Sequence, residues 1–224
     1  MPKSIIKLEN ISKSFLLDTY ENKVLKNIDI EIFEGEFISI IGPSGSGKST
    51  LMNIIGCLDR PTMGTYLLDG IDVLSKKDKD LANIRSKKIG FVFQSFNLIP
   101  RLSLLANVET PMIYARSKNR KKKATEILNK VGLNHRLNYK PNQVSGGETQ
   151  RAAIARALIN DPKIILADEP TGNLDSKNGA EVLKIFKELN EKGVTIILVT
   201  HDPNIAKMAQ RTIRLMDGEV EKDV

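Results

Sequence analysis

The nine residues GPSGSGKST, Gly42 to Thr50, constrain the fold of this 224-residue chain more than any other stretch. They follow FISII, a continuous apolar run typical of a strand buried on both faces of a parallel sheet, and precede the helical pattern STLMNIIGCL. The pattern G-x-x-x-x-G-K-[ST] between a strand and a helix is typical of a phosphate-binding loop. The sequence therefore predicts an α/β domain with a site for a nucleoside triphosphate.

The residue types in this loop match the chemistry of a triphosphate. Glycines let successive backbone N–H groups turn inward, and the start of the following helix adds partial positive charge. Lys48 is expected to reach the β- and γ-phosphates, and the Ser49 hydroxyl to ligate Mg²⁺. The predicted nucleotide-binding residues of the loop are Gly42, Pro43, Ser44, Gly45, Ser46, Gly47, Lys48, Ser49 and Thr50.

Two further apolar runs end in polar residues. KIILADEP ends with Asp168, which suits the Mg²⁺-supporting aspartate of such enzymes, and Glu169, which is displaced by one residue and so points differently. We expect Glu169 to polarise the water that attacks the γ-phosphate. VTIILVTHD places His201 just past a buried strand, where ligands bind in α/β folds, and predicts a γ-phosphate contact.

Strand and helix patterns alternate along most of the chain, which favours one α/β domain with a mostly parallel sheet. The β-rich runs SIIKLENI and KNIDIEIF open the chain and are expected to form an N-terminal antiparallel β subdomain. Residues 95–160 show helices and turns only. We predict that they form a helical subdomain inserted into a core of residues 1–94 and 161–224.

The composition excludes several classes of protein. No apolar run approaches the roughly 20 residues that cross a bilayer, and the N-terminus lacks the apolar core of a signal peptide. The single cysteine, Cys57, has apolar neighbours, so we expect it to be a small buried hydrophobe in a reducing compartment. These features predict a cytoplasmic protein.

The net charge of +7 comes mostly from two stretches, SKKDKDLANIRSKK and RSKNRKKK. Neither is interleaved with aromatic residues as a groove for single-stranded nucleic acid would be. We interpret both as solvated helix faces, with proximity to acidic lipid headgroups as the alternative.

The stretch QVSGGETQRAAIARAL carries a second glycine-containing loop. Ser145 and Glu148 predict a capping box, in which each side chain satisfies a backbone N–H of the other residue. One glycine would be enough for a helix cap, so the pair Gly146 and Gly147 also suggests a phosphate-facing loop with no lysine of its own.

Taken together, these motifs resemble the ATP-binding subunit of an ABC transporter over nearly the whole chain. The phosphate loop resembles that family's Walker A motif and IILADE its Walker B motif with the catalytic glutamate. VFQSFNLIP contains the Q-loop glutamine at Gln94, VSGGE is similar to the signature usually written LSGGQ, GNLD resembles the D-loop, and His201 the switch histidine.

Three positions depart from the family's common wording: Val144 for leucine, Glu148 for glutamine, and Gly172-Asn173 for serine-alanine. Val144 is expected to serve packing only. Glu148 still satisfies the capping box, so we expect its function to be retained and its side chain to point back into its own helix.

The resemblance also implies an aromatic residue that stacks on adenine. Phe15 is the candidate by position, although Tyr20 is close enough to keep that assignment open.

A head-to-tail homodimer that closes around ATP and Mg²⁺ is implied by the resemblance. Lys48, Gln94, Glu169 and His201 are then the catalytic residues, and Ser49, Gln94 and Asp168 hold Mg²⁺, the last through water. The residues expected to act on the partner's nucleotide are Ser145, Gly146, Gly147, Glu148 and Asp175.

NIIGCLDRPTMGTYLLDG and ADEPTGNLDS resemble the macrolide-exporter and lipoprotein-release branch, the MacB/LolD type, or the peptide-resistance transporters of the same branch. The implied partner is an integral membrane permease at the inner face of the cell membrane, working on lipoprotein, peptide or antibiotic type substrates. The apolar residues after Gln94 could line the groove for a permease helix or belong to the helical core; they are Phe96, Leu98, Ile99 and Leu102.

Two alternatives stay open at this point. One is the ATPase of a non-transporting membrane regulator of the cell-division type. The other is a soluble ABC ATPase acting on nucleic acid. This alternative is less favoured because such proteins usually carry a coiled-coil insertion, a zinc-binding cluster or a second cassette, and the sequence shows none of these. No nucleic-acid partner is expected.

Overall fold

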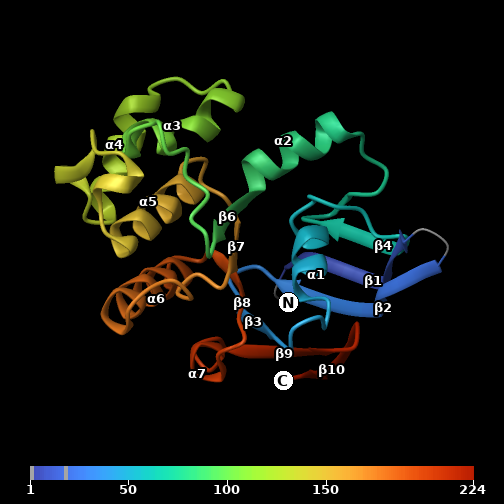
Figure 1. Ribbon diagram of the computed structural model, residues 1–224. Coiled ribbons are helices and arrows are strands. Elements are labelled where there is room, and N and C mark those ends of the chain that lie inside the picture. Colours follow the sequence, from blue (N-terminus) through green and yellow to red (C-terminus); the bar gives the residue numbers. More distant parts are fainter. Residues whose placement is uncertain (1–2, 18–19) are drawn as a thin grey trace. The chain divides into compact units, whose positions relative to one another are not determined.

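A computed structural model describes residues 3–17 and 20–224 of the chain (Figure 1). The chain divides into two compact units. The first unit spans Met1–Ala82 and Thr195–Val224, and the second spans Asn83–Val194. The fold is of the predicted α/β class, with a parallel-rich sheet and an antiparallel β subdomain.

The first unit contains an antiparallel sheet with strand order β2-β1-β4-β5. Its strands form because apolar and polar residues alternate, as in β2, where Ile28, Ile30 and Ile32 are buried while Asp29 is exposed. The strands are β1 (Ser4–Leu17), β2 (Tyr20–Phe33), β4 (Met63–Leu68) and β5 (Ile71–Asp72).

A second set of strands in the first unit supports the phosphate loop. Strand β3 pairs in parallel with both β8 and β9, and β10 pairs antiparallel with β9. Ile40 of β3 lies opposite Val199 of β8, so the residues that follow each strand emerge at the same end. The elements are β3 (Phe37–Ile41), α1 (Lys48–Ile55), β8 (Thr195–Val199), α7 (Pro203–Ala206), β9 (Arg211–Met216) and β10 (Glu219–Asp223).

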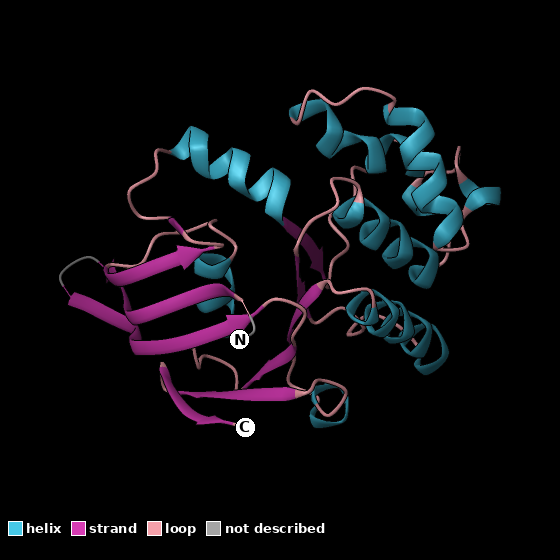
Figure 2. Cartoon of the chain, turned by 180° about the vertical axis from the view of Figure 1, so that it is seen from behind, coloured by secondary structure: helices cyan, strands magenta, loops and turns pink. Residues whose placement is uncertain are grey.

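The second unit combines a parallel strand pair with a group of helices (Figure 2). Its strands are β6 (Ile89–Phe93) and β7 (Ile164–Asp168). Its helices are α3 (Leu104–Tyr114), α4 (Arg120–Lys130), α5 (Gly146–Leu158) and α6 (Ser176–Glu191), with 3-10 turns η1 (Asn134–Arg136) and η2 (Pro141–Gln143). Helix α2 (Asp78–Lys88) crosses the boundary between the units.

Helices α3, α4 and α5 share an apolar core in which Leu104, Val108, Leu128 and Ala152 are completely buried. Residues 95–160 hold only helices and turns, as the sequence suggested. They lie in the second unit together with β6, β7 and α6, and their treatment as a separate subdomain stays a prediction.

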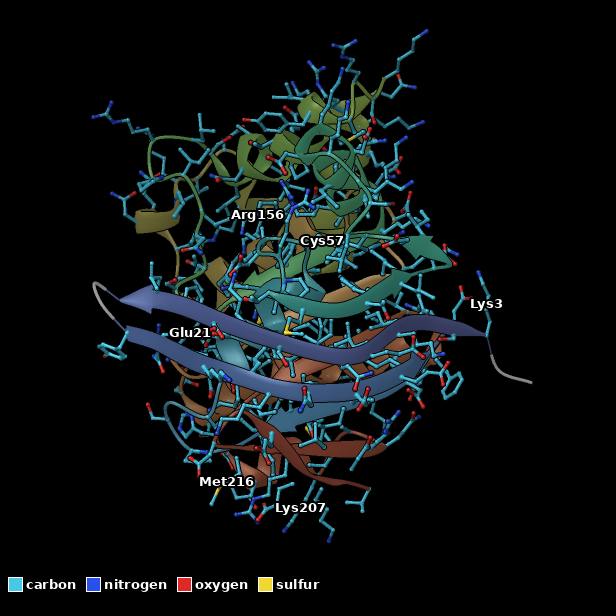
Figure 3. All side chains as sticks on the ribbon, turned by 90° about the vertical axis from the view of Figure 1, so that its right-hand side faces the viewer. Lys3, Glu21, Cys57, Arg156, Lys207 and Met216 are labelled. Atoms are coloured by element: carbon cyan, nitrogen blue, oxygen red, sulfur yellow. The ribbon has the colours of Figure 1, made fainter. Side chains whose placement is uncertain are left out.

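Cys57, labelled in Figure 3, is 3% exposed, which confirms the expectation of a buried thiol. Among the described residues, no helix is long and apolar enough to cross a membrane.

Candidate nucleotide-binding site

The phosphate loop of the first unit has the backbone of an anion-binding loop. Gly45 and Gly47 have φ angles of 81° and 100°, a region that residues with a Cβ adopt only under strain. The N-cap residue of α1 is Gly47, so no capping side chain accepts hydrogen bonds from the first amides of this helix. The first turn of α1 also contains no acidic residue. Because the first amides of a helix have no intrahelical acceptor, this helix start can receive a phosphate group.

Side chains in the loop also fit a triphosphate. The Lys48 ammonium donates to the carbonyl oxygens of Gly42 at 2.8 Å and Pro43 at 2.7 Å, which holds its charge over the loop. The Ser46 hydroxyl is buried and has no hydrogen-bond partner within the described chain. A Cβ on Gly42 would lie 2.2 Å from the Leu215 carbonyl oxygen. A buried hydroxyl without a partner costs free energy, and a phosphate oxygen would supply that partner.

His201 lies beside the beginning of the phosphate loop. The amide of Thr200 continues the pairing of the strands by donating to the Ile40 carbonyl at 3.1 Å, so His201 emerges where Gly42 does. Both residues border one cavity of 560 Å³. The first unit thus brings together the predicted loop and the predicted switch histidine.

The two candidates for stacking on adenine both lie at the end of the β1–β2 hairpin. Phe15 is 40% exposed and carries the Lys13 ammonium 4.8 Å from its ring centroid. Tyr20 is 62% exposed. Both rings are accessible, so the choice of Phe15 stays a prediction.

In the second unit, the strand register collects the predicted Walker B and Q-loop residues. Phe93 pairs with Asp168, the last residue of β7, so Gln94 after β6 and Glu169 after β7 emerge at the same end of the strand pair. Glu169 has a φ of 43°, in the left-handed region. Such a conformation costs about 1–3 kcal/mol for a residue with a side chain and is concentrated at active sites.

Gln94 lies directly against the D-loop. The side-chain nitrogen Nε2 of Gln94 donates to Asn173 Oδ1 at 3.4 Å, and Asn173 Nδ2 donates to the backbone carbonyl of Gln94 at 3.0 Å. A Cβ on Gly172 would lie 2.5 Å from Gln94 Nε2. Gly172 and Asn173, where the family usually has serine and alanine, therefore match this orientation of the Gln94 side chain: Gly172 leaves room for it and Asn173 hydrogen-bonds to it. Its contact with Mg²⁺ stays a prediction.

The signature loop forms the predicted capping box. Ser145 Oγ accepts a hydrogen bond from the Glu148 amide at 3.2 Å, and the Glu148 carboxylate accepts one from the Ser145 amide at 2.9 Å. Glu148 also accepts from Arg136 Nε at 3.0 Å. The Ser145 amide and Arg136 lower the pKa of Glu148, so the carboxylate stays ionised at neutral pH. The expectation that Glu148 points back into its own helix is confirmed.

The two signature glycines have different reasons to be glycine. A Cβ on Gly147 would lie 2.0 Å from Asn178 Oδ1, so packing within the chain excludes a side chain there. Gly146 is exposed, and its nearest neighbour would be Leu174 Cδ2 at 3.4 Å, an ordinary contact. The chain's own fold therefore leaves Gly146 unexplained, which is the signal expected of a glycine that serves a binding partner.

Asp175 of the D-loop caps α6. Its carboxylate accepts from the Asn178 amide at 2.9 Å and from Asn178 Nδ2 at 2.6 Å. These hydrogen bonds lower the pKa of Asp175. The predicted role of Asp175 at a dimer interface stays a prediction beside this local one.

Sequence reasoning missed Gln150, whose side chain is completely buried. Gln150 Nε2 donates to the carbonyl of Pro170, the residue after Glu169, at 2.6 Å. The sequence did carry a signal for Gln150: its polar side chain lies on the same helix face as Ala153, Ile154 and Ala157, where an apolar side chain would be ordinary.

Arg156 was missed as well. Its guanidinium donates to the carbonyls of Phe96, at 3.0 Å, and Asn97, two Q-loop residues with positive φ angles. Burial lowers the pKa of Arg156. For the apolar residues after Gln94, which could line a permease groove or belong to the helical core, the structure differs from residue to residue: Leu98 packs against the helical core, and Ile99 is 45% exposed.

Comparisons with known proteins agree with this site. A family model described as ABC transporter matches residues 25–172. The chain is 58% identical over 221 residues to YvrO of Bacillus subtilis, an uncharacterized ABC transporter ATP-binding protein, with 98% of this chain and 96% of YvrO covered. It is 51% identical over 223 residues to the Escherichia coli macrolide export ATP-binding/permease protein MacB, with 99% of this chain and 34% of MacB covered.

Among solved structures, a dimeric post-hydrolysis state of the ATP-binding cassette MJ0796 of Methanocaldococcus jannaschii, bound to ADP and Pi, matches with a TM-score of 0.90. The two sequences are 50% identical, and the match covers 98% of this chain and 97% of that one. Given these matches and the phosphate loop described above, the chain belongs to the ABC transporter family, as an ATP-binding subunit that hydrolyses ATP.

Proposed function

We propose that two copies of this chain pair head to tail around ATP and that the cycle of pairing and hydrolysis drives a separate membrane permease. Gly146 carries this proposal, because it is exposed at the start of α5 and nothing in its own chain requires a glycine there. A partner's phosphate groups would require it, since close approach to backbone amides leaves no room for a side chain. The dimeric MJ0796 structures support the same assembly.

The residues divide the work between the two chains. Lys48 and the loop amides bind the β- and γ-phosphates, Glu169 takes the proton of the attacking water, and His201 contacts the γ-phosphate. Mg²⁺ held by Ser49, Gln94 and, through water, Asp168 would neutralise charge on the phosphates. The partner contributes Ser145, Gly146, Gly147, Glu148 and Asp175.

Substitution of Gly146 by alanine tests the shared site. We expect the Gly146→Ala chain to fold normally, because the new methyl group meets only ordinary contacts. We expect ATP-dependent pairing to weaken about tenfold to hundredfold, because overpacking at a close contact costs about 1–3 kcal/mol. Sedimentation at saturating ATP and Mg²⁺, in a hydrolysis-deficient background, measures the effect.

Gly179→Ala is the matched control, since a Cβ there would lie 3.7 Å from Thr171 in the interior of α6. It should leave pairing unchanged. If Gly146→Ala pairs as tightly as this control, the signature loop does not meet the partner's nucleotide.

The partner we propose is an integral permease of the macrolide-exporter and lipoprotein-release type, which would place the chain at the inner face of the cell membrane. Support comes from MacB, described as an ATP-binding/permease protein, about a third of which this chain matches. The substrate class we propose is lipoprotein, peptide or antibiotic, and residues 95–160 are the proposed subdomain that carries the signature loop.

Co-purification with the permease encoded next to this chain's gene tests the partner. We expect a stable complex with a four-span permease that has a large extracytoplasmic domain, and ATP turnover that rises with the correct substrate. A chain that binds ATP but shows no turnover, alone or with that permease, would contradict the catalytic assignment. A regulator of the cell-division type would show turnover that no transported compound changes.

A further inference from the structure

The segment between α3 and α4 forms a concentrated basic surface. Residues 116–123 contain six cations and no acid. Five of these side chains are exposed and border an open cavity of 940 Å³, in which Glu109 is the only bordering acid. We call these five the basic patch: Arg116, Lys118, Arg120, Lys121 and Lys122.

The fold of the chain does not account for this charge. Arg120, Lys121 and Lys122 occupy the first turn of α4, where the helix dipole disfavours cations, and the first turn holds no acid. Asn119 caps this helix without a side-chain hydrogen bond. In the described part of the chain no member of the basic patch forms an ion pair, whereas the neighbouring Lys123 pairs with Asp161. The patch is therefore a site of like-charge repulsion that an anionic partner would relieve.

Two exposed apolar side chains precede the basic patch closely in the sequence. Tyr114 is 81% exposed and Ile113 is 54% exposed, both in the last turn of α3. Tyrosine has an apolar ring and a polar tip, which suits the interface between lipid headgroups and acyl chains. Cations beside an exposed aromatic and an aliphatic residue are typical of surfaces that lie on anionic membranes.

The other basic stretch of the chain differs from this one. In the first turn of α2 the exposed Lys79 stands between Asp78 and Asp80, so the charges alternate in sign there. The remaining cations of α2 lie in its last turn, where the helix dipole favours positive charge; they are Arg85, Lys87 and Lys88. The described residues of α2 include no exposed aromatic or large aliphatic side chain. Alternating charge is the pattern of a solvated helix face. The two basic stretches are similar in composition, but their charge patterns and neighbouring side chains distinguish them.

We propose that the basic patch, with Ile113 and Tyr114, contacts the anionic headgroups of the membrane surface directly. Lipid is favoured over nucleic acid because a single-strand groove needs a series of aromatic rings, and only Tyr114 is present here. This contact goes beyond the proposed permease partnership, since it needs neither permease nor nucleotide. It would hold the second unit against the bilayer throughout the ATP cycle.

Vesicle flotation of the purified full chain tests the proposal. We expect binding to vesicles of phosphatidylcholine with phosphatidylglycerol and none to phosphatidylcholine alone. The triple variant Arg120→Gln, Lys121→Gln, Lys122→Gln should lower the partition coefficient about hundredfold, at about fivefold for each cation near the surface. Raising the salt concentration should weaken binding, because surface charges are screened.

The matched control removes the same charge from α2 and the residue just before it, with Lys77→Gln, Lys79→Gln and Lys87→Gln, all of which are exposed. This control chain should bind almost like the original chain. Tyr114→Ser removes the apolar anchor without touching charge or α4, and should lower binding severalfold. It keeps the test valid if the triple variant unfolds.

Three results would overturn the proposal. Equal loss in the α2 control would show attraction by net charge alone, and equal binding to neutral vesicles would show no role for headgroup charge. Displacement of the chain from anionic vesicles by a single-stranded RNA oligonucleotide, with loss of RNA binding in the Tyr114→Ser chain, would assign the patch to nucleic acid. None of these results bears on ATP hydrolysis or on head-to-tail pairing, which are tested separately.

Discussion

Replacing Glu169 with glutamine is expected to lower ATP turnover about 10²- to 10⁴-fold, the usual worth of a general base. The carboxamide keeps the size of the side chain but cannot take a proton. ATP binding should persist, because the phosphate loop and Lys48 are unchanged. Steady-state phosphate release measures the loss. Sedimentation with saturating ATP and Mg²⁺ should show a dimer that does not reopen.

Glu191→Gln is the control, because Glu191 is exposed at the end of α6 and belongs to the same unit. It should leave turnover unchanged. If the Glu169→Gln chain keeps more than half of the original ATP turnover, Glu169 is not the general base. A Glu169→Gln chain that stays monomeric with ATP and Mg²⁺ would count heavily against the proposed pairing.

Replacing Lys48 with alanine is expected to weaken ATP binding about tenfold to hundredfold, since a hydrogen bond to a charged group contributes about 1.5–3 kcal/mol. The turnover number should fall a further 10²- to 10³-fold, the cost of removing one positioned donor from developing charge. The melting temperature should not fall, because Lys48 is the first residue of α1, where a positive charge is unfavourable to the helix dipole. Calorimetric titration with ATP gives the affinity.

Lys207→Ala serves as the control, because Lys207 is an exposed lysine of the same unit, labelled in Figure 3. Its affinity for ATP should match that of the original chain. An affinity of the Lys48→Ala chain within twofold of this control would show that the ammonium does not reach the phosphates.

The parts of the site that short segments determine could be predicted from the sequence. The phosphate loop needs only glycines at two positive φ angles and a lysine at the start of a helix, and Gly45, Gly47 and Lys48 meet both needs in the structure. The capping box of Ser145 and Glu148 is equally local. Buried strands such as β3 and β8 were predicted because continuous apolar runs have few other solutions.

The parts that depend on contacts between distant segments could not be predicted. Gly146 and Gly147 look alike in the sequence, and only the packing of Asn178 against Gly147 separates them. Gln150 and Arg156 act through carbonyls of segments that lie 20 and about 60 residues away in the chain. No pattern in one helix shows which backbone oxygens will meet it.

The hydrogen bond from Gln150 to Pro170 has a consequence for a paired molecule. Gln150 lies one turn after Gly146 on the same helix, and Pro170 follows Glu169 directly. In the proposed dimer, the start of this helix meets the nucleotide of the other chain, whereas Glu169 serves the nucleotide of its own. Occupancy of one site would then reach the catalytic base of the other through a single amide. ATP turnover at the two sites would therefore be coupled, and because turnover is a kinetic quantity, this coupling need not be equal in both directions.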